Sequence, residues 1–123
     1  MGMKAFFFDT HALIELVKAN PYYRKYGEAL ILTSQHNLIE FYYSLIHDFD
    51  EKTAKAVYYH FKECVQVVSD DINFEAMEMK KKCKKRNLSY VDCIGYISAK
   101  QQNIKFLTGD KEFEHMQNVE FVK

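Results

Sequence analysis

The 123-residue sequence lacks tryptophan and contains only one proline and four glycines. Disordered and fibrous chains are typically rich in proline, glycine or polar residues, so this composition excludes both classes. The chain has instead ten phenylalanines and nine tyrosines, which can bury enough apolar surface for a folded core. Because the length is that of one ordinary domain, we expect a single domain over residues 1–123.

The sequence also lacks an excess of charge, with 17 basic and 17 acidic residues. A general attraction for nucleic acid or anionic lipid is therefore excluded, and any nucleic-acid contact must be local. No apolar run approaches the roughly 20 residues of a membrane-spanning helix, and the apolar start of the chain is too short for a signal peptide. The three cysteines show neither CxxC spacing nor histidines at zinc-ligand spacing, so we expect a cytoplasmic protein without a membrane partner.

Short apolar runs alternate along the chain with segments of helical periodicity. This alternation predicts a three-layer α/β/α domain whose central, mainly parallel sheet has about four to five strands. We expect strands at residues 4–8, 29–33, 65–68 and 105–108, with a further edge strand at 119–122. We expect helices at residues 11–18, 34–49, 50–63, 70–87 and 90–102.

Four acidic residues follow the predicted strands. Asp9 follows the first strand and Asp110 follows the fourth, and Glu40 lies about one and a half turns into the helix after the second. Asp92 lies in the first turn of the last long helix. Because the carboxyl ends of parallel strands meet at one edge of a sheet, we expect all four carboxylates to converge there.

Each of these acids also has an ordinary structural interpretation. Asp9 and Asp110 stand where helix N-caps belong, and Ser89-Tyr-Val-Asp92 matches a capping box. Glu40 lies off the apolar stripe of its helix and is equally explained as a solvent-facing residue. The functional hypothesis therefore depends on the joint arrangement.

Several carboxylates at one edge repel one another, and a bound cation relieves that repulsion. Oxygen ligands without histidine or cysteine suit Mg²⁺ or Mn²⁺, which coordinate a few carboxylates together with water and substrate phosphate oxygens. Such a site can activate water against a phosphodiester. The constellation indicates metal-assisted phosphodiester hydrolysis.

Four segments of the chain together resemble the PIN domain, and the size resembles the VapC-type toxin ribonucleases. They are Phe-Phe-Asp9-Thr10-His-Ala-Leu-Ile, Thr-Ser-x4-Ile-Glu40, Leu-Ser-Tyr-Val-Asp92-x-Ile-x4-Ala99 and Phe-Leu-Thr108-Gly-Asp110-Lys-Glu-Phe113. The resemblance implies a metal-dependent endoribonuclease, the toxin of a toxin–antitoxin pair, with RNA as substrate and a small antitoxin as partner. It implies that Asp9, Glu40, Asp92 and Asp110 hold Mg²⁺ or Mn²⁺ and position the attacking water, Asp9 and Asp92 being the principal ligands.

The resemblance further assigns supporting hydroxyls to Thr10 and Thr108. A threonine beside a turn is otherwise a local hydrogen-bonding residue. His11 departs from the family, which usually has serine, asparagine or another small polar residue at that position.

The basic run at residues 80–86 ends a predicted helix, where positive charge complements the helix dipole. As a functional alternative, Lys81, Lys82 and Lys85 would contact RNA phosphates. Asp70 and Asp71 follow a strand predicted to lie at the sheet edge, so we interpret them as caps outside the site.

Two tyrosine pairs, Tyr42-Tyr43 and Tyr58-Tyr59, lie on neighbouring predicted helices. Core packing accounts for one member of each pair, and the other members are candidates for a homodimer or antitoxin surface.

Three other functions are compatible with parts of the pattern. A haloacid dehalogenase-type phosphatase also has an acid after its first strand, but it needs a second Asp at the position of His11. A response-regulator receiver needs an acidic pair after the first strand and an Asp at the end of the third. The ends of the strands predicted here do not match that pattern. A non-catalytic PIN-like scaffold or RNA-binding module stays open, since its acids would act only as caps.

Overall fold

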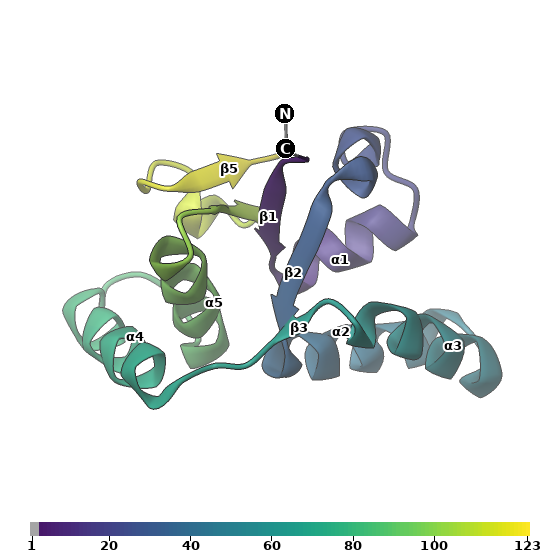
Figure 1. Ribbon diagram of the computed structural model, residues 1–123, viewed down its shortest axis with the longest axis horizontal. Helices are drawn as coiled ribbons and strands as arrows, with labels where there is room; N and C mark the ends of the chain where they lie inside the picture. The colour runs from purple at the N-terminus through teal and green to yellow at the C-terminus, as the bar shows by residue number, and fades with distance from the viewer. Residues whose placement is uncertain (1–2) are drawn as a thin grey trace.

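A five-stranded, entirely parallel sheet forms the centre of the molecule in the computed structural model, which describes residues 3–123 (Figure 1). The strands are β1 (Ala5–Phe8), β2 (Leu30–Ser34), β3 (Val65–Gln66), β4 (Lys105–Thr108) and β5 (Val119–Phe121). They lie in the order β3-β2-β1-β4-β5. The strands β2 and β3 are therefore added on one side of β1, and β4 and β5 on the other. The α/β class and the parallel sheet predicted from the sequence are confirmed, including the edge positions of β3 and β5.

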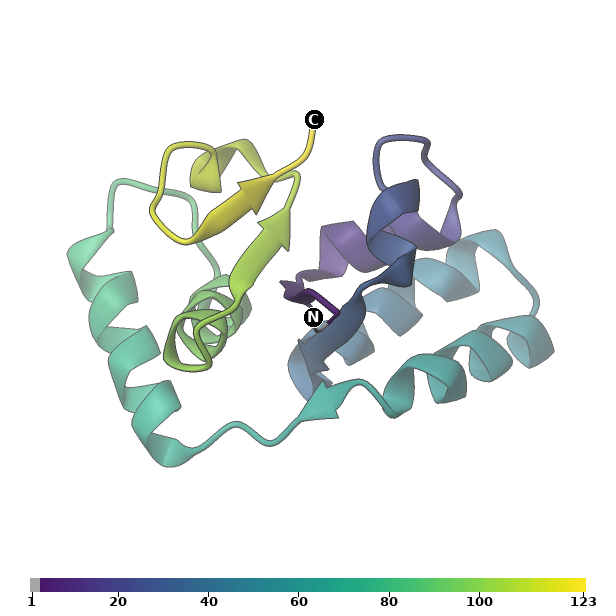
Figure 2. The ribbon, with the colours of Figure 1, turned by 45° about the horizontal axis from the view of Figure 1, so that its top comes forward.

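Two helical layers cover the sheet (Figures 1 and 2). One layer contains α1 (Thr10–Val17), α2 (Gln35–Asp48) and α3 (Glu51–Lys62), and the other contains α4 (Asp70–Lys82) and α5 (Tyr90–Gln101). Two short 3₁₀ helices, η1 (Arg24–Glu28) and η2 (Lys111–Phe113), lie in the connections. None of the helices in residues 3–123 has the length and apolarity needed to cross a membrane.

The alternation of side chains along β1 divides the core into two halves. Phe6 and Phe8 face α1, α2 and α3, whereas Phe7 faces α4 and α5. All three rings are buried, as a strand at the centre of a doubly covered sheet requires. The continuous apolar run that predicted this strand therefore reflects burial on both faces.

Every α-helix begins at an Asp or Ser whose side chain accepts a backbone N–H of the first turn. The helix ends were harder to predict. The prediction that the fourth long helix reaches Asn87 is wrong, because α4 ends at Lys82. Between Lys82 and Leu88 only Cys83 packs against the core, and Arg86 and Asn87 bond to Glu112 instead of continuing the helix.

Gly95 allows α5 to lie close against the sheet. A Cβ at this position would lie 2.9 Å from Cε1 of Phe7 and 3.0 Å from Cε1 of Phe106, both in buried rings. We expect Gly95→Ala to destabilise the protein by about 1–3 kcal/mol through overpacking, measured by urea unfolding. Gly27→Ala is the matched control, because its Cβ would meet only Leu16 Cδ1 at an ordinary 3.4 Å. Equal stabilities for the two variants would contradict this packing.

Candidate active site

Asp9 is the most buried acid at the carboxyl edge of the sheet. It follows β1 directly, caps α1 and is 4% exposed. Its Oδ1 accepts the Ala12 N–H at 2.7 Å, and its Oδ2 accepts the Thr108 hydroxyl at 2.5 Å. The carboxyl group is thus fixed in orientation by the first turn of α1 and by the end of β4.

Burial raises the pKa of Asp9 from 3.8 to about 7, and the nearby carboxylates of Asp92 and Asp110 push it in the same direction. The hydrogen bonds from Thr108 and Ala12 act in the opposite sense, because they favour the charged form. Desolvation is the largest of these effects. A carboxylate held here among like charges is a high-energy group, and a cation would lower that energy.

Asp92 and Asp110 approach the same edge from two other segments. Asp92 completes the capping box of α5, with its Oδ2 accepting the Ser89 N–H at 2.9 Å. Burial raises the pKa of Asp92, and the charges of Asp110 and Glu40 add to that effect. Asp110 caps η2 through Oδ1, and its own N–H donates to the Thr108 hydroxyl at 3.0 Å. Thr108 therefore links the carboxyl group of Asp9 to the backbone of Asp110.

Glu40 reaches the edge from α2 and is held there by Thr10. The Thr10 hydroxyl donates to Glu40 Oε1 at 2.6 Å and accepts the Asn37 side-chain amide at 3.1 Å. Asn37 is 2% exposed and in turn accepts the Ser34 hydroxyl at 2.6 Å. Ser34 and Asn37 were not among the predicted site residues. The sequence signal that could have indicated them is the Ser34-x-x-Asn37 spacing at the start of a predicted helix.

All four predicted acids lie at one edge, and both predicted supporting threonines contact an acid. The capping interpretation also holds for Asp9, Asp92 and Asp110. Over residues 3–123, no three His, Cys, Asp or Glu side chains are close enough together to enclose a metal ion by themselves. Any ion at this edge would need water or substrate oxygens to complete its coordination.

The three lysines predicted to contact phosphate are all exposed, but they lie in different surroundings. Lys81 lines a groove together with Leu88. Leu88 directly precedes Ser89, which forms the capping box with Asp92. Lys82 lines another groove, with Glu75 and Glu78 of α4. Lys85 belongs to neither groove.

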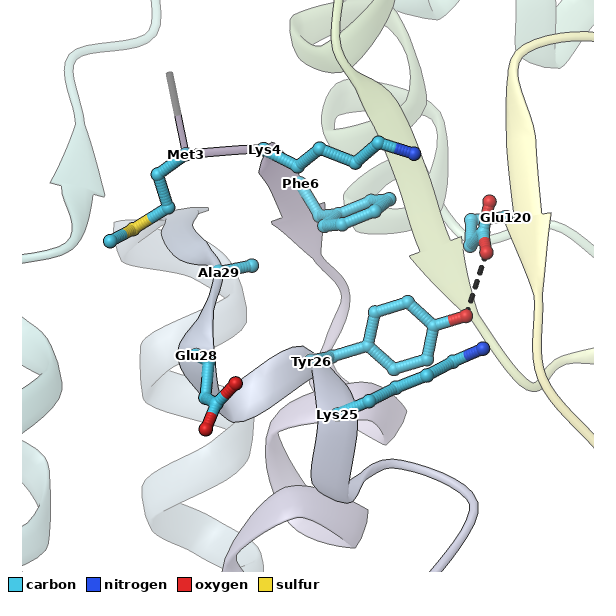
Figure 3. A pocket seen from close by; sticks show the side chains of 8 residues that line it. All are labelled: Met3, Lys4, Phe6, Lys25, Tyr26, Glu28, Ala29 and Glu120. Carbon is cyan, nitrogen blue, oxygen red and sulfur yellow. Dashed lines mark hydrogen bonds between the residues drawn. The ribbon is translucent and has the colours of Figure 1, made fainter. Parts of the chain in front are cut away.

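A further groove, of about 290 Å³, lies near the amino ends of β1 and β2, away from the acids (Figure 3). Its wall includes Tyr26, whose hydroxyl donates to Glu120 Oε2 at 2.7 Å. Lys4 and Glu28, which precede β1 and β2, lie at its rim. It contains none of the four site acids, so it is separate from the candidate active site.

The pKa of Asp9 offers a test of the Thr108 contact. Thr108→Val removes the hydroxyl that stabilises the carboxylate, so we expect the pKa of Asp9 to rise further. NMR titration of the aspartate carboxyl carbons in the metal-free protein measures this pKa. Thr53→Val, at an exposed position of α3, should leave it unchanged. A pKa of Asp9 that stays near 7 in Thr108→Val would contradict the contact.

The sequence model of the PIN domain matches residues 6–119, which is most of the chain. The chain belongs to the PIN domain family. The matched range includes all four segments on which the resemblance was based, so the resemblance is confirmed. Among curated proteins, no sequence matches this PIN domain significantly.

Several solved structures share the fold of this PIN domain. VapC20 from Mycobacterium tuberculosis, described as a toxin that cleaves the sarcin-ricin loop, has a TM-score of 0.75 at 22% identity, over 96% of this chain and 99% of its own. A toxin–antitoxin complex from Klebsiella pneumoniae gives 0.74 at 20% identity, over 93% and 94%. VapBC2 from Rickettsia felis, bound to a DNA fragment from its promoter, gives 0.75 at 17% identity, over 97% and 99%. At these identities the similarity concerns the fold.

Proposed function

We propose that this PIN domain, acting as one unit over residues 1–123, is a metal-dependent endoribonuclease that hydrolyses RNA phosphodiester bonds. The main support is the buried Asp9 carboxyl group, which lies beside Asp92 and Asp110 and has a pKa raised to about 7. Capping a helix requires neither burial nor like-charged neighbours, so capping does not account for this arrangement. The family and the cleaving activity of VapC20, a structural neighbour, support RNA as the substrate.

The residues at the edge fit Mg²⁺ or Mn²⁺. Their side-chain donors are carboxylate and hydroxyl oxygens, which hard divalent cations prefer. Mg²⁺ usually binds one or two carboxylates and keeps several waters, so a group of three protein ligands is not required. We assign Asp9 and Asp92 as the principal ligands, with Glu40 and Asp110 as further ligands or partners of bound water.

When bound, such an ion would lower the pKa of a water molecule that it coordinates and would stabilise negative charge on phosphate oxygens. The protein residues hold the carboxylates in position for that chemistry. Thr108 fixes Asp9 Oδ2, and Thr10 fixes Glu40 Oε1. We assign Glu40, the exposed acid of the cluster, and Asp110 to orient the attacking water and to accept its proton, because Asp9 and Asp92 are assigned as the principal ligands.

We further propose that the protein is a cytoplasmic toxin controlled by a small antitoxin. Three structural neighbours are described as toxin–antitoxin or VapBC complexes. Tyr43 and Tyr59 are each 67% exposed, whereas Tyr42 and Tyr58 pack against the core, so one tyrosine of each pair is available to an antitoxin or a second copy. The cysteines are all free, which fits a reducing compartment.

Cleavage of a panel of structured RNAs tests this proposal, with Mg²⁺, with Mn²⁺ and with a chelator. We expect cutting only with a divalent ion, and its loss on chelation to be reversed by adding excess Mn²⁺. Folded protein that cuts no RNA under any of these conditions would contradict the proposal and favour a non-catalytic scaffold.

A further inference from the structure

The segment at residues 80–86 concentrates the positive charge of the chain. It contains six of the 17 basic residues within seven positions, in a protein whose formal net charge is zero. All six side chains are exposed, and none takes part in a salt bridge within residues 3–123. The remainder of the chain is therefore net acidic, and this segment is a local, uncompensated cationic surface.

Two of these side chains hold the segment beside the acids. Lys80 Nζ donates to the Leu88 carbonyl at 2.7 Å, and Arg86 Nη1 donates to the Glu112 carbonyl at 2.8 Å. Leu88 precedes Ser89, whose N–H binds Asp92. The Glu112 N–H binds the Asp110 carboxylate at 2.9 Å. The basic segment is thus attached at both ends to the residues that position Asp92 and Asp110.

A groove of about 400 Å³ lies between these attachment points. Lys80, Lys81, Lys84 and Arg86 contribute its basic side chains, and Leu88 lies in its wall. Lys81 and Lys84 make no side-chain hydrogen bond to residues 3–123, so their ammonium groups are free to bind a ligand in the groove. We call this surface the basic groove.

We propose that the basic groove binds a backbone phosphate of the RNA strand that is cleaved at the acids, with Lys81 and Lys84 as the contacting residues. This inference rests on the proposed ribonuclease function. Four carboxylates repel a polyanion, and the balanced net charge gives no general attraction to offset that repulsion. A pair of lysines in a groove that is attached to the residues positioning Asp92 and Asp110 offsets it locally and guides the strand toward the acids.

Stabilisation of the helix end explains only part of the segment. Favourable charge–dipole interactions are confined to about the last turn of a helix. Lys80, Lys81 and Lys82 occupy that turn of α4, whereas Lys84 and Arg86 lie beyond the end of the helix. Arg86 is instead held by its bond to the Glu112 carbonyl, and Lys84 lines the basic groove.

The test compares three double variants in an Asp92→Asn background, which is used to separate RNA binding from cleavage. They are Lys81→Gln/Lys84→Gln, Lys82→Gln/Lys85→Gln and, as a charge-matched control, Lys18→Gln/Lys52→Gln at exposed positions of the opposite helical layer. Fluorescence anisotropy of a labelled single-stranded oligouridine gives Kd at several salt concentrations. Circular dichroism confirms that each variant is folded.

We expect Lys81→Gln/Lys84→Gln to weaken binding by roughly tenfold and to reduce the slope of log K against log salt by about 0.7, which corresponds to one lost phosphate contact on a single strand. The control should keep the slope of the parent protein. In the active background the same pair should raise KM with little change in kcat, because the contact is made before and during the reaction alike.

The outcomes separate this inference from the proposed function. If the wild-type protein cleaves RNA and the Lys81/Lys84 and Lys82/Lys85 variants lose equal affinity and slope, the segment acts as diffuse charge and the groove proposal is wrong. A Lys81/Lys84 variant that matches the control would also overturn it while leaving the nuclease intact. If the wild-type protein neither binds nor cleaves RNA with Mg²⁺ or Mn²⁺, the ribonuclease proposal itself fails.

Discussion

Asp92→Asn is expected to lower the rate of RNA cleavage by at least about a hundredfold while leaving the protein folded. Asparagine keeps an oxygen that can accept the Ser89 N–H, so the capping box of α5 is preserved. It lacks the negative charge that a divalent ion requires from this position. Initial rates at saturating Mn²⁺, beside circular dichroism spectra, measure both parts of this prediction.

Asp71→Asn is the matched control for that substitution. Asp71 is an exposed acid in the first turn of α4, after the edge strand β3, and lies outside the cluster. We expect it to retain wild-type cleavage. Equal activity of the Asp92 and Asp71 variants would show that Asp92 acts only as a helix cap.

Asp9→Asn is expected to stabilise the metal-free protein at pH 8 and to leave its stability near pH 4 little changed. The pKa of Asp9 is about 7 in the folded protein against 3.8 in the unfolded chain, mainly because of burial. Between these two values the folded state retains a proton that the unfolded state releases, so wild-type stability falls as the pH rises from about 4 to about 7. The full difference is on the order of 4 kcal/mol above pH 7.

Asparagine is neutral throughout this pH range, so the variant does not lose stability as the pH rises. Thermal unfolding in the presence of a chelator should place the variant above the wild-type protein by on the order of 10 °C at pH 8, with the two curves converging near pH 4. The raised pKa of Asp92 adds a dependence of the same sign, which both proteins share. A variant less stable than wild type at pH 8 would contradict the account of Asp9 as a strained buried carboxylate.

The acids and the strands were predictable from the sequence because each depends on local signals. The run Phe6–Phe8 predicts a doubly buried strand, and Asp9 and Asp110 follow the ends of predicted strands. In a parallel sheet, that position alone places both acids at one edge. Ser34 and Ser89 similarly predicted the starts of α2 and α5.

The hydrogen-bond network was not predictable, because it depends on contacts between elements. The contact of Thr10 with Glu40 and Asn37 needs the packing of α1 against α2, which no local pattern specifies. The predicted end of α4 was wrong for a similar reason. Arg86 leaves the helix to bond a carbonyl 26 positions away in sequence.

We expect the carboxylates around Asp9 to bind the divalent ion that supports hydrolysis. Calorimetric titration of Mn²⁺ into metal-free wild-type protein and into the Asp9→Asn/Asp92→Asn double variant measures this binding, since a contaminating ribonuclease cannot imitate binding heat. We expect saturable binding to the wild-type protein that is lost in the folded double variant. Equal binding by both proteins, or none by either, would show that these carboxylates do not hold the ion.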